Sequence, residues 1–310
     1  MTAEPVNPFS VAPFPSAMQP LNPVDHDHDH LYVDVDSTGA QYLEFQRQMG
    51  DLTSVLDHGR IVLATGERGC GKSALLNRCA AWVVGELKPR GVTAKVVDTT
   101  TTFAVDQRMG VTDRIIKVCD RLFDVMRREG LIRPDALDEF RENRREPHRV
   151  YDNLGYFMPD RHVLVLRLPS PEDLWQEVVS YASLVCGGVL FLMESAHLDR
   201  EQVRRITRET EALTKPVVLE VGPLADGDAR KFIEARLNPQ GIPGRFPRMS
   251  DQTVVSAGHK FATVAQLQRT LHSTYEFRMS QADYEDGAWV TIEDILDDVK
   301  RRSGDGSGAP

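Results

Sequence analysis

The stretch of sequence that decides the fold is residues 66–73, Gly66-Glu67-Arg68-Gly69-Cys70-Gly71-Lys72-Ser73. It has the GxxxxGKS spacing of a phosphate loop, in which glycines let the backbone turn its N–H groups toward phosphate oxygens. The apolar, β-branched run before it, Arg60–Thr65, predicts a buried parallel strand. The run after it, Ala74–Val84, predicts a helix whose N-terminus adds partial positive charge at the loop. Strand, loop and helix in this order predict a cradle for the phosphates of a nucleotide.

The residues of this loop have separate expected roles. Lys72 is expected to reach the β- and γ-phosphates, and the Ser73 hydroxyl to ligate Mg²⁺. The predicted nucleotide-binding residues are Gly66, Glu67, Arg68, Gly69, Cys70, Gly71, Lys72, Ser73 and Ala74.

Phosphoryl chemistry at such a loop also needs an acid at the end of a neighbouring strand. The apolar run Val189–Met193 delivers Glu194 to that edge, so Glu194 is predicted to complete the magnesium site with Ser73. Ser195 follows where a water-orienting carboxylate is expected, and a hydroxyl is a weak substitute. Lys72, Glu194 and Ser195 are therefore the predicted catalytic residues of a slow or inactive hydrolase.

The strand that carries the acid stays open at this point. Val163–Leu168 is the other candidate for the acid-bearing position, and it would move Glu194 to the neighbouring sensor strand. That strand ends in Arg167-Leu168-Pro169 and brings no acid to its tip. The chemistry therefore favours Glu194, although a plain surface charge at a strand end is the alternative.

The composition is that of a globular protein of one or two domains. The chain has 310 residues, 41% hydrophobic and 27% charged, with a net charge of −9, which does not support tight nucleic-acid binding. Its four cysteines form no CxxC pair, which favours a reducing compartment over a disulfide framework or a zinc site. No run approaches the about 18 apolar residues of a membrane span. No secretion signal is visible, so we expect a cytoplasmic protein.

Strand and helix patterns alternate from residue 31 to 224 and predict an α/β P-loop NTPase core with a five-stranded parallel sheet. The expected strands are Ile61–Thr65, Ala94–Thr99, Val163–Leu168, Val189–Met193 and Val217–Val221. Residues 1–30 are expected to form an extended Pro-rich N-terminal arm, and residues 225–302 a small all-helical lid domain. Residues 303–310 are a predicted flexible tail. Between the strands, one helix is expected to have Thr112 as its N-cap and to bury Ile115, Ile116, Cys119, Leu122, Phe123 and Met126.

Three further features each have two interpretations. The alternating run Asp25–His30 suits a transition metal, but a solvated segment is favoured and no metal is assigned. Residues 131–160 interleave arginines with acids, which favours a solvated helical face over a nucleic-acid contact. Cys70 is either a reactive thiol whose pKa is lowered by Lys72 and the helix N-terminus or a small packed residue, and the second is favoured.

Four motifs resemble those of AAA-type P-loop ATPases, in particular the branch that contains origin-recognition, secretion-associated and STAND-like ATPases. They are Asn7-Pro8-Phe9, the loop GERGCGKS, the box LFLMESAHL at 190–198, and the segment 221–237 that is similar to the last strand and first lid helix of that branch. The likeness spans roughly residues 5–275, and only the phosphate loop is specific. The resemblance implies ATP and Mg²⁺ as cofactors.

The departures from that family pattern concern the acids and arginines. The family's Asp-Glu pair is Glu194-Ser195 here, and the arginine that usually begins the last lid helix is replaced by the segment Ala262-Thr263-Val264. Lys260 and Arg269 are possible substitutes. Candidates for an arginine acting on a neighbouring subunit's nucleotide are Arg200, Arg204, Arg205 and Arg208.

The leading hypothesis is an ATP-binding AAA/STAND-like protein whose nucleotide state moves the lid, with slow or partner-stimulated hydrolysis. A homo-oligomer or a protein partner is expected. The second hypothesis is a non-hydrolysing nucleotide-dependent scaffold or signalling adaptor, which Ser195 supports. A small-molecule kinase is the third hypothesis, since such enzymes share the GxxxxGKS loop. The lack of an evident arginine-rich lid over the phosphates argues against it. A GTPase is least favoured, because the chain has no Asn-Lys-x-Asp segment.

Overall fold

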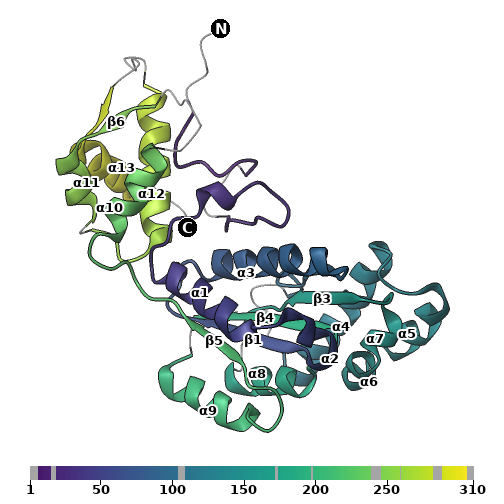
Figure 1. The fold of residues 1–310 in the computed structure, drawn as a ribbon. Helices are drawn as coiled ribbons and strands as arrows, with labels where there is room; N and C mark the ends of the chain where they lie inside the picture. Colours follow the sequence, from purple (N-terminus) through teal and green to yellow (C-terminus); the bar gives the residue numbers. More distant parts are fainter. Residues whose placement is uncertain are drawn as a thin grey trace.

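The computed structural model of the chain describes residues 6–14, 19–103, 109–171, 174–196, 198–238, 246–258, 260–281 and 288–305. Its core is a five-stranded parallel sheet with the strand order β2-β3-β4-β1-β5 (Figure 1). The strands are β1 (Arg60–Thr65), β2 (Thr93–Asp98), β3 (His162–Arg167), β4 (Val189–Ser195) and β5 (Val217–Glu220). The predicted fold class is confirmed, with each strand end within two residues of its expected position.

Helices cover both faces of the sheet, which is why its three inner strands are almost wholly apolar. The apolar side chains of one face pack against α1 (Thr38–Met49), α2 (Val55–His58) and α3 (Lys72–Leu87). The other face packs against α4 (Val111–Arg128), α5 (Leu137–Asn143), α6 (Pro147–Asp152), α7 (Leu154–Phe157), α8 (Leu174–Ser183) and α9 (Arg200–Thr210). In the described parts of the chain, four short 3-10 helices lie in the connections: Asp29–Leu31, Leu52–Ser54, Lys88–Arg90 and Pro134–Ala136.

The start of α4 differs from the prediction. Gly110, not Thr112, is its N-cap, and no side chain caps the helix there. Ile116 is only partly buried, while Val118 takes a fully buried position. The shift arises because the apolar stripe of this helix centres on Val118 and Leu122 and leaves Ile116 at its margin.

The C-terminal part of the chain forms a separate lobe of helices (Figure 1). Its helices are α10 (Asp228–Leu237), α11 (Asp251–Gly258), α12 (Val264–Met279) and α13 (Ile292–Asp305). The lobe also holds two short parallel strands, β6 (Arg248–Met249) and β7 (Trp289–Val290), which the prediction of an all-helical lid omitted. Two-residue strands carry no periodic pattern, so the sequence gives no signal for them. We call residues 225–305 the lid.

The N-terminal arm packs against the lid instead of lying free of any core. Phe9 is fully buried and its ring centroid lies 5.0 Å from that of Tyr275. Asn7 Nδ2 donates to the His272 carbonyl oxygen at 3.0 Å, and Gln268 Nε2 donates to the Phe9 carbonyl oxygen. The arm is therefore part of the lid's hydrophobic cluster. At the other end of the chain α13 continues to Asp305, and the rest of the predicted tail lies outside the described residues.

The charged segment 131–160 is mostly engaged in packing and ion pairs. Its helices α5, α6 and α7 bury Phe140, Tyr151 and Phe157 beneath the sheet. Four arginines of this segment form ion pairs with nearby carboxylates: Arg141 pairs with Asp138, Arg144 and Arg145 with Asp120, and Arg149 with Glu146. These pairs leave the segment with little unpaired positive charge for a nucleic-acid backbone.

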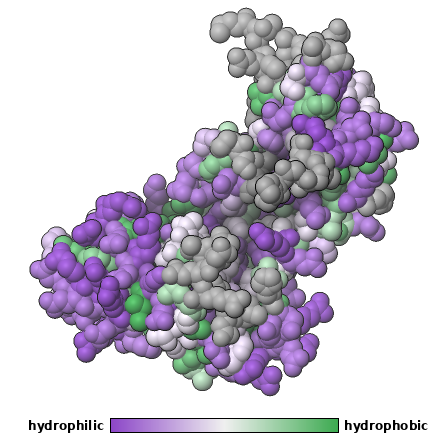
Figure 2. Space-filling model, turned by 180° about the vertical axis from the view of Figure 1, so that it is seen from behind, coloured by the Kyte–Doolittle hydropathy of each residue, from purple (hydrophilic) through white to green (hydrophobic). Residues whose placement is uncertain are grey.

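On the face shown in Figure 2 the surface is mainly hydrophilic, and apolar residues form small separate patches. Among the described helices, none combines the length and apolar character that a membrane span requires.

Candidate functional site

The loop of residues 66–73 joins β1 to α3 at the carboxyl edge of the sheet. Gly66 and Gly69 have φ angles of 141° and 89°, a region of backbone conformation that favours glycine. A Cβ atom on Gly66 would lie 2.0 Å from the Val221 carbonyl oxygen, so any side chain there would push the loop off the sheet. Glycine at this position is therefore a condition for the loop's shape.

Lys72 lies inside the turn of this loop. Its Nζ donates to the carbonyl oxygens of Gly66 at 2.9 Å and Glu67 at 2.7 Å, and the residue is only 7% exposed. Burial lowers the pKa of Lys72, and the nearby carboxylate of Glu194 partly opposes this effect. Charged phosphate oxygens are stronger partners for an ammonium group than carbonyls, so a phosphate entering the loop would improve the contacts of Lys72.

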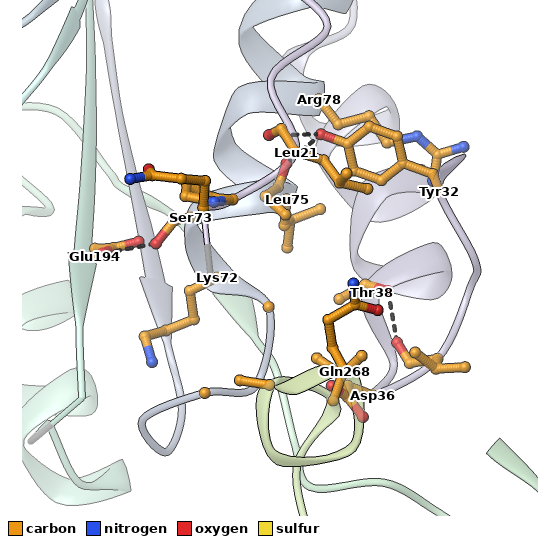
Figure 3. Close-up of a pocket in the computed structure, with 18 of the residues that line it drawn as sticks. Leu21, Tyr32, Asp36, Thr38, Lys72, Ser73, Leu75, Arg78, Glu194 and Gln268 are labelled. Atoms are coloured by element: carbon orange, nitrogen blue, oxygen red, sulfur yellow. Dashed lines mark hydrogen bonds between the residues drawn. The ribbon is translucent and has the colours of Figure 1, made fainter. Parts of the chain in front are cut away.

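Ser73 and Glu194 meet across the gap between α3 and β4 (Figure 3). The Ser73 hydroxyl donates to Glu194 Oε1 at 2.9 Å. Glu194 Oε2 is buried and has no hydrogen-bond partner within the described parts of the chain. A hydroxyl and a carboxylate with a spare oxygen fit the all-oxygen shell of Mg²⁺, which commonly keeps waters and phosphate oxygens as its other ligands.

β4, and not β3, brings a carboxylate to the loop. β4 lies directly beside β1 with Glu194 opposite Ala64, whereas β3 is one strand further out. β3 ends in Arg167, whose guanidinium lies 3.2 Å from the carboxylate of Asp98. Of the two strand positions left open by the sequence, only β4 places an acid against Ser73.

Ser195 is the last residue of β4 and lies opposite Thr65 of β1. It is 2% exposed and lines the same cavity as Glu194. Because successive side chains of a strand point to opposite faces, Ser195 and Glu194 do not face α3 together. A serine hydroxyl stays protonated at neutral pH, so it does not reproduce a water-orienting carboxylate.

A cavity of about 640 Å³ extends from these residues and reaches the lid. Its volume lies in the range of about 300–1,000 Å³ that small-molecule sites occupy. Four parts of the chain contribute to its walls. They are the loop with α3 and the end of β4, the N-terminal segment between Val11 and Thr38, Ser170 and Pro171 after β3, and lid residues of α10 and α12.

The predicted binding residues divide into two groups. Those that line the cavity are Arg68, Gly69, Gly71, Lys72, Ser73 and Ala74. Gly66, Glu67 and Cys70 are not among its lining residues. The first two present their carbonyl oxygens to Lys72, and the third packs into the core.

The arm is a wall of the cavity that the sequence did not reveal. Tyr32 Oη donates to the carbonyl oxygens of Ala74 at 2.8 Å and Leu21 at 3.2 Å, which holds the arm against the first turn of α3. Asn77 Nδ2 donates to the Leu21 carbonyl oxygen at 2.7 Å. In the predicted polar run, His28 holds the arm's own backbone together, because its ring bridges the Asn22 backbone N–H and the Ala12 carbonyl oxygen.

Lys260 and Arg269, suggested as substitutes for the family's lid arginine, do not line the cavity. The four arginines of α9 were suggested for a neighbouring subunit's nucleotide, and that role stays a prediction. Arg236 of α10 does line the cavity, 5% exposed, with Nε and Nη1 unpartnered within the described residues. Burial lowers the pKa of Arg236 to about 10. An arginine on the apolar stripe of α10, four residues after Phe232, was the available sequence signal.

Cys70 is a packed residue and not an activated thiol. It is fully buried in the cluster beneath α3, and burial raises the pKa of its thiol, with only a partial opposing effect from Lys72. The interpretation as a low-pKa thiol is therefore wrong.

Cys70 in the native protein is expected to react with iodoacetamide at least about tenfold more slowly than a free cysteine, because it is buried and protonated. Mass spectrometry of the alkylated protein measures this. Fast modification of Cys70 that ATP prevents would restore the reactive interpretation.

No protein-family model matches this chain, and neither does any curated protein sequence. Similar solved structures exist at low sequence identity. The Aeropyrum pernix ORC2 protein in its ADPNP–ADP complexes superposes with a TM-score of 0.55 at 12% identity, covering 98% of this chain and 74% of that one. The Aeropyrum pernix ORC1 protein in complex with DNA gives a TM-score of 0.54 at 14% identity, covering 86% of this chain and 66% of that one.

Drosophila ORC bound to DNA gives a TM-score of 0.52 at 12% identity, covering 89% of this chain and 65% of that one. The chain thus spans about two thirds to three quarters of the length of these proteins. At such identities the likeness concerns the fold. The chain has the fold of the AAA-type P-loop ATPases of the origin-recognition branch, as its motifs predicted.

Proposed function

We propose that this protein binds ATP with Mg²⁺ and acts as a conformational switch, with slow or partner-stimulated hydrolysis. The nucleotide would occupy the cavity with its phosphates at Lys72 and Ser73. Glu194 would hold the magnesium shell, and the metal would neutralise charge on the phosphates. The four cysteines, all free, suit a reducing compartment such as the cytoplasm.

The observation that carries the proposal is a hydrogen bond between the loop and the lid. The Ala265 N–H, in the first turn of α12, donates to the Gly69 carbonyl oxygen at 3.1 Å. A Cβ atom on Gly69 would lie 3.0 Å from Thr263 Oγ1, so the two backbones are in close contact. Phosphates that reorient the loop would therefore change a contact of the lid directly, and the lid's position would depend on the nucleotide.

A non-hydrolysing scaffold is the second candidate. The described acids that line the cavity are Asp36 and Glu194. The support for the scaffold is that Glu194 is the one hydrogen-bonded to Ser73 and that a serine, not a second acid, follows it. The two candidates share the switch and differ only in turnover.

The switch predicts that a non-hydrolysable ATP analogue and ADP protect the start of α12 to different degrees. Hydrogen exchange of peptides containing Ala265 is expected to differ by at least about fivefold between the two complexes, because opening the lid exposes that amide. Equal exchange in both complexes, with binding verified by calorimetry, would contradict the switch.

A glycine pair provides the matched variants for this experiment. Gly69→Ala places a Cβ against Thr263 at a positive φ, so it is expected to raise exchange at Ala265 without nucleotide. Gly85 lies on α3, and a Cβ atom added there meets nothing within 4 Å. Gly85→Ala is therefore expected to leave the hydrogen exchange at Ala265 unchanged. If both variants show the same exchange at Ala265, the contact between Gly69 and Ala265 does not couple the loop to the lid.

A further inference from the structure

Asp36 is a buried acid in the wall of the cavity. It is fully buried, and neither carboxylate oxygen has a partner at full hydrogen-bond geometry within the described residues. The large majority of buried polar atoms in proteins do have such a partner, so each exception needs a reason. Burial and the nearby carboxylate of Asp228 raise the pKa of Asp36 to about 7. The Val264 backbone N–H stabilises the charged carboxylate to a smaller extent than burial destabilises it. Keeping this carboxylate buried and charged at neutral pH therefore destabilises the fold.

The backbone of Asp36 is held in an uncommon conformation. Asp36 has a φ of 55° and its neighbour Ser37 a φ of 64°, both uncommon for residues other than glycine. The Asp36 N–H donates to Asp228 Oδ2 at 3.1 Å, and the Asp36 carbonyl oxygen accepts from the Gly222 N–H at 3.2 Å. The lid and the segment after β5 thus hold the backbone of Asp36 from both sides. Uncommon backbone angles held in this way are typical of functional positions.

Asp36 lines the same cavity as the phosphate loop, and Thr38, two residues after it, neighbours the loop itself. Gly71 of the loop has the side chains of Thr38 and Val264 as its neighbours, at 3.5 Å and 3.8 Å from a Cβ built on it. In Figure 3, Asp36, Thr38 and Gln268 lie on the side of the cavity away from Glu194. A nucleotide with its phosphates in the loop therefore has this part of the cavity available for its base.

The surroundings of Asp36 match a flat base with polar edges. Val35, Phe232 and Val264 give apolar contact area. Gln268 Oε1, also buried, is a second unpartnered acceptor, and Arg236 carries unpartnered donors in the same cavity. A ligand that satisfies this end must present both donors and acceptors, as nucleobases do.

We propose that Asp36 determines base specificity by accepting a hydrogen bond from the exocyclic amine of the nucleotide's base, which in ATP is the 6-amino group. This inference rests on the proposed nucleotide site and names a residue of it. A site built to bind such an amine rejects an analogue that lacks it, because the acceptor then stays buried and unpaired.

Calorimetric titration with ATP and with inosine triphosphate tests the proposal, since the latter replaces the 6-amino group with an oxygen. The wild type is expected to bind ATP about 10–100-fold more tightly than inosine triphosphate. In Asp36→Asn the amide can donate to the 6-oxo group, so this ratio is expected to fall to about threefold or less. Asp34→Asn is the matched control, because Asp34 is a half-exposed partner of Arg78 outside the cavity, and its ratio should equal that of the wild type.

The stability of the variant separates a ligand contact from a structural role. The folded-state pKa of Asp36 is raised, so its contribution to stability falls as the pH rises from about 4 to about 7. Of the groups around it, the Asp228 carboxylate raises that pKa and the Val264 N–H lowers it. At pH 8, nucleotide-free Asp36→Asn is therefore expected to melt at or above the wild-type temperature. A clearly lower melting temperature would assign Asp36 a structural role and overturn the proposal.

The outcomes also distinguish this proposal from the one on which it rests. Equal affinity of the wild type for the two triphosphates would overturn the role of Asp36 and leave the nucleotide site in place. An unchanged ratio in Asp36→Asn would do the same. Binding of neither triphosphate would overturn both proposals.

Discussion

Lys72→Ala is expected to weaken ATP binding by roughly 30- to 1,000-fold, corresponding to about 2–4 kcal/mol for a lost charge-assisted contact with phosphate oxygens. Lys72 is the buried cation of the loop, and its ammonium group is already held within hydrogen-bond distance of the Gly66 and Glu67 carbonyls. The low exposure of the site excludes much of the water that would otherwise screen this charge. Isothermal titration calorimetry at fixed salt measures the loss.

The matched control for this variant is Lys88→Ala. Lys88 lies just after the C-terminal end of α3 and is exposed, so its removal changes the net charge equally but touches no part of the cavity. Its ATP affinity should stay within about twofold of the wild type. Lys72→Ala should also remain folded, because it removes a buried charge and no apolar packing. Wild-type affinity in folded Lys72→Ala would place the nucleotide outside the loop.

The sequence predicts the loop well because its determinants are local. The glycines, Lys72 and Ser73 lie within eight residues, and the flanking strand and helix are recognisable from their own patterns. Glu194 is also within reach of prediction, since an acid after an apolar strand must lie at the carboxyl edge of a parallel sheet. What the sequence did not decide was which strand neighbours β1. Strand order depends on packing between distant segments, and the structure supplies it.

The remaining walls of the cavity depend on contacts between residues far apart in the chain. Tyr32 meets Ala74 through a tyrosine hydroxyl and a backbone carbonyl, and neither group has a sequence pattern that indicates the other. The Pro-rich composition of the arm favoured an extended segment without a core, yet Phe9 finds its core in the lid. The sequence did not indicate the role of Asp36 either. An acid among polar residues is expected to be exposed, and only the structure shows that this one is buried.

Glu194→Gln is expected to reduce magnesium-dependent phosphate release from ATP by about 100-fold or more, the scale on which loss of a charged group at a phosphoryl-transfer site acts. The amide can still accept the hydrogen bond of the Ser73 hydroxyl, which in the wild type spans 2.9 Å, so the loop should keep its shape. The negative charge that favours Mg²⁺ is lost. Phosphate release at saturating ATP and Mg²⁺ measures the effect, and ATP affinity in the presence of a chelator should change by less than about fivefold.

Glu220→Gln is the control variant. It removes a carboxylate from a strand end outside the cavity, so it separates the effect of losing a negative charge from the effect of losing it beside Ser73. Glu220 also ends a strand beside β1, since β5 pairs with β1 on the side away from β4, but it is exposed and lies outside the cavity. If Glu194 acts through the magnesium shell, only its own substitution reduces turnover and the magnesium dependence of ATP affinity. If both variants behave like the wild type, the carboxylate on β4 is a strand-end charge and the Ser73 contact is incidental.

A third outcome would favour the non-hydrolysing switch over the ATPase. In that case the wild type releases phosphate no faster than Glu194→Gln, but magnesium still tightens ATP binding only when Glu194 is present. The single hydroxyl of Ser195 beside the metal-side acid is then the physical reason, because no carboxylate stands there to orient the attacking water.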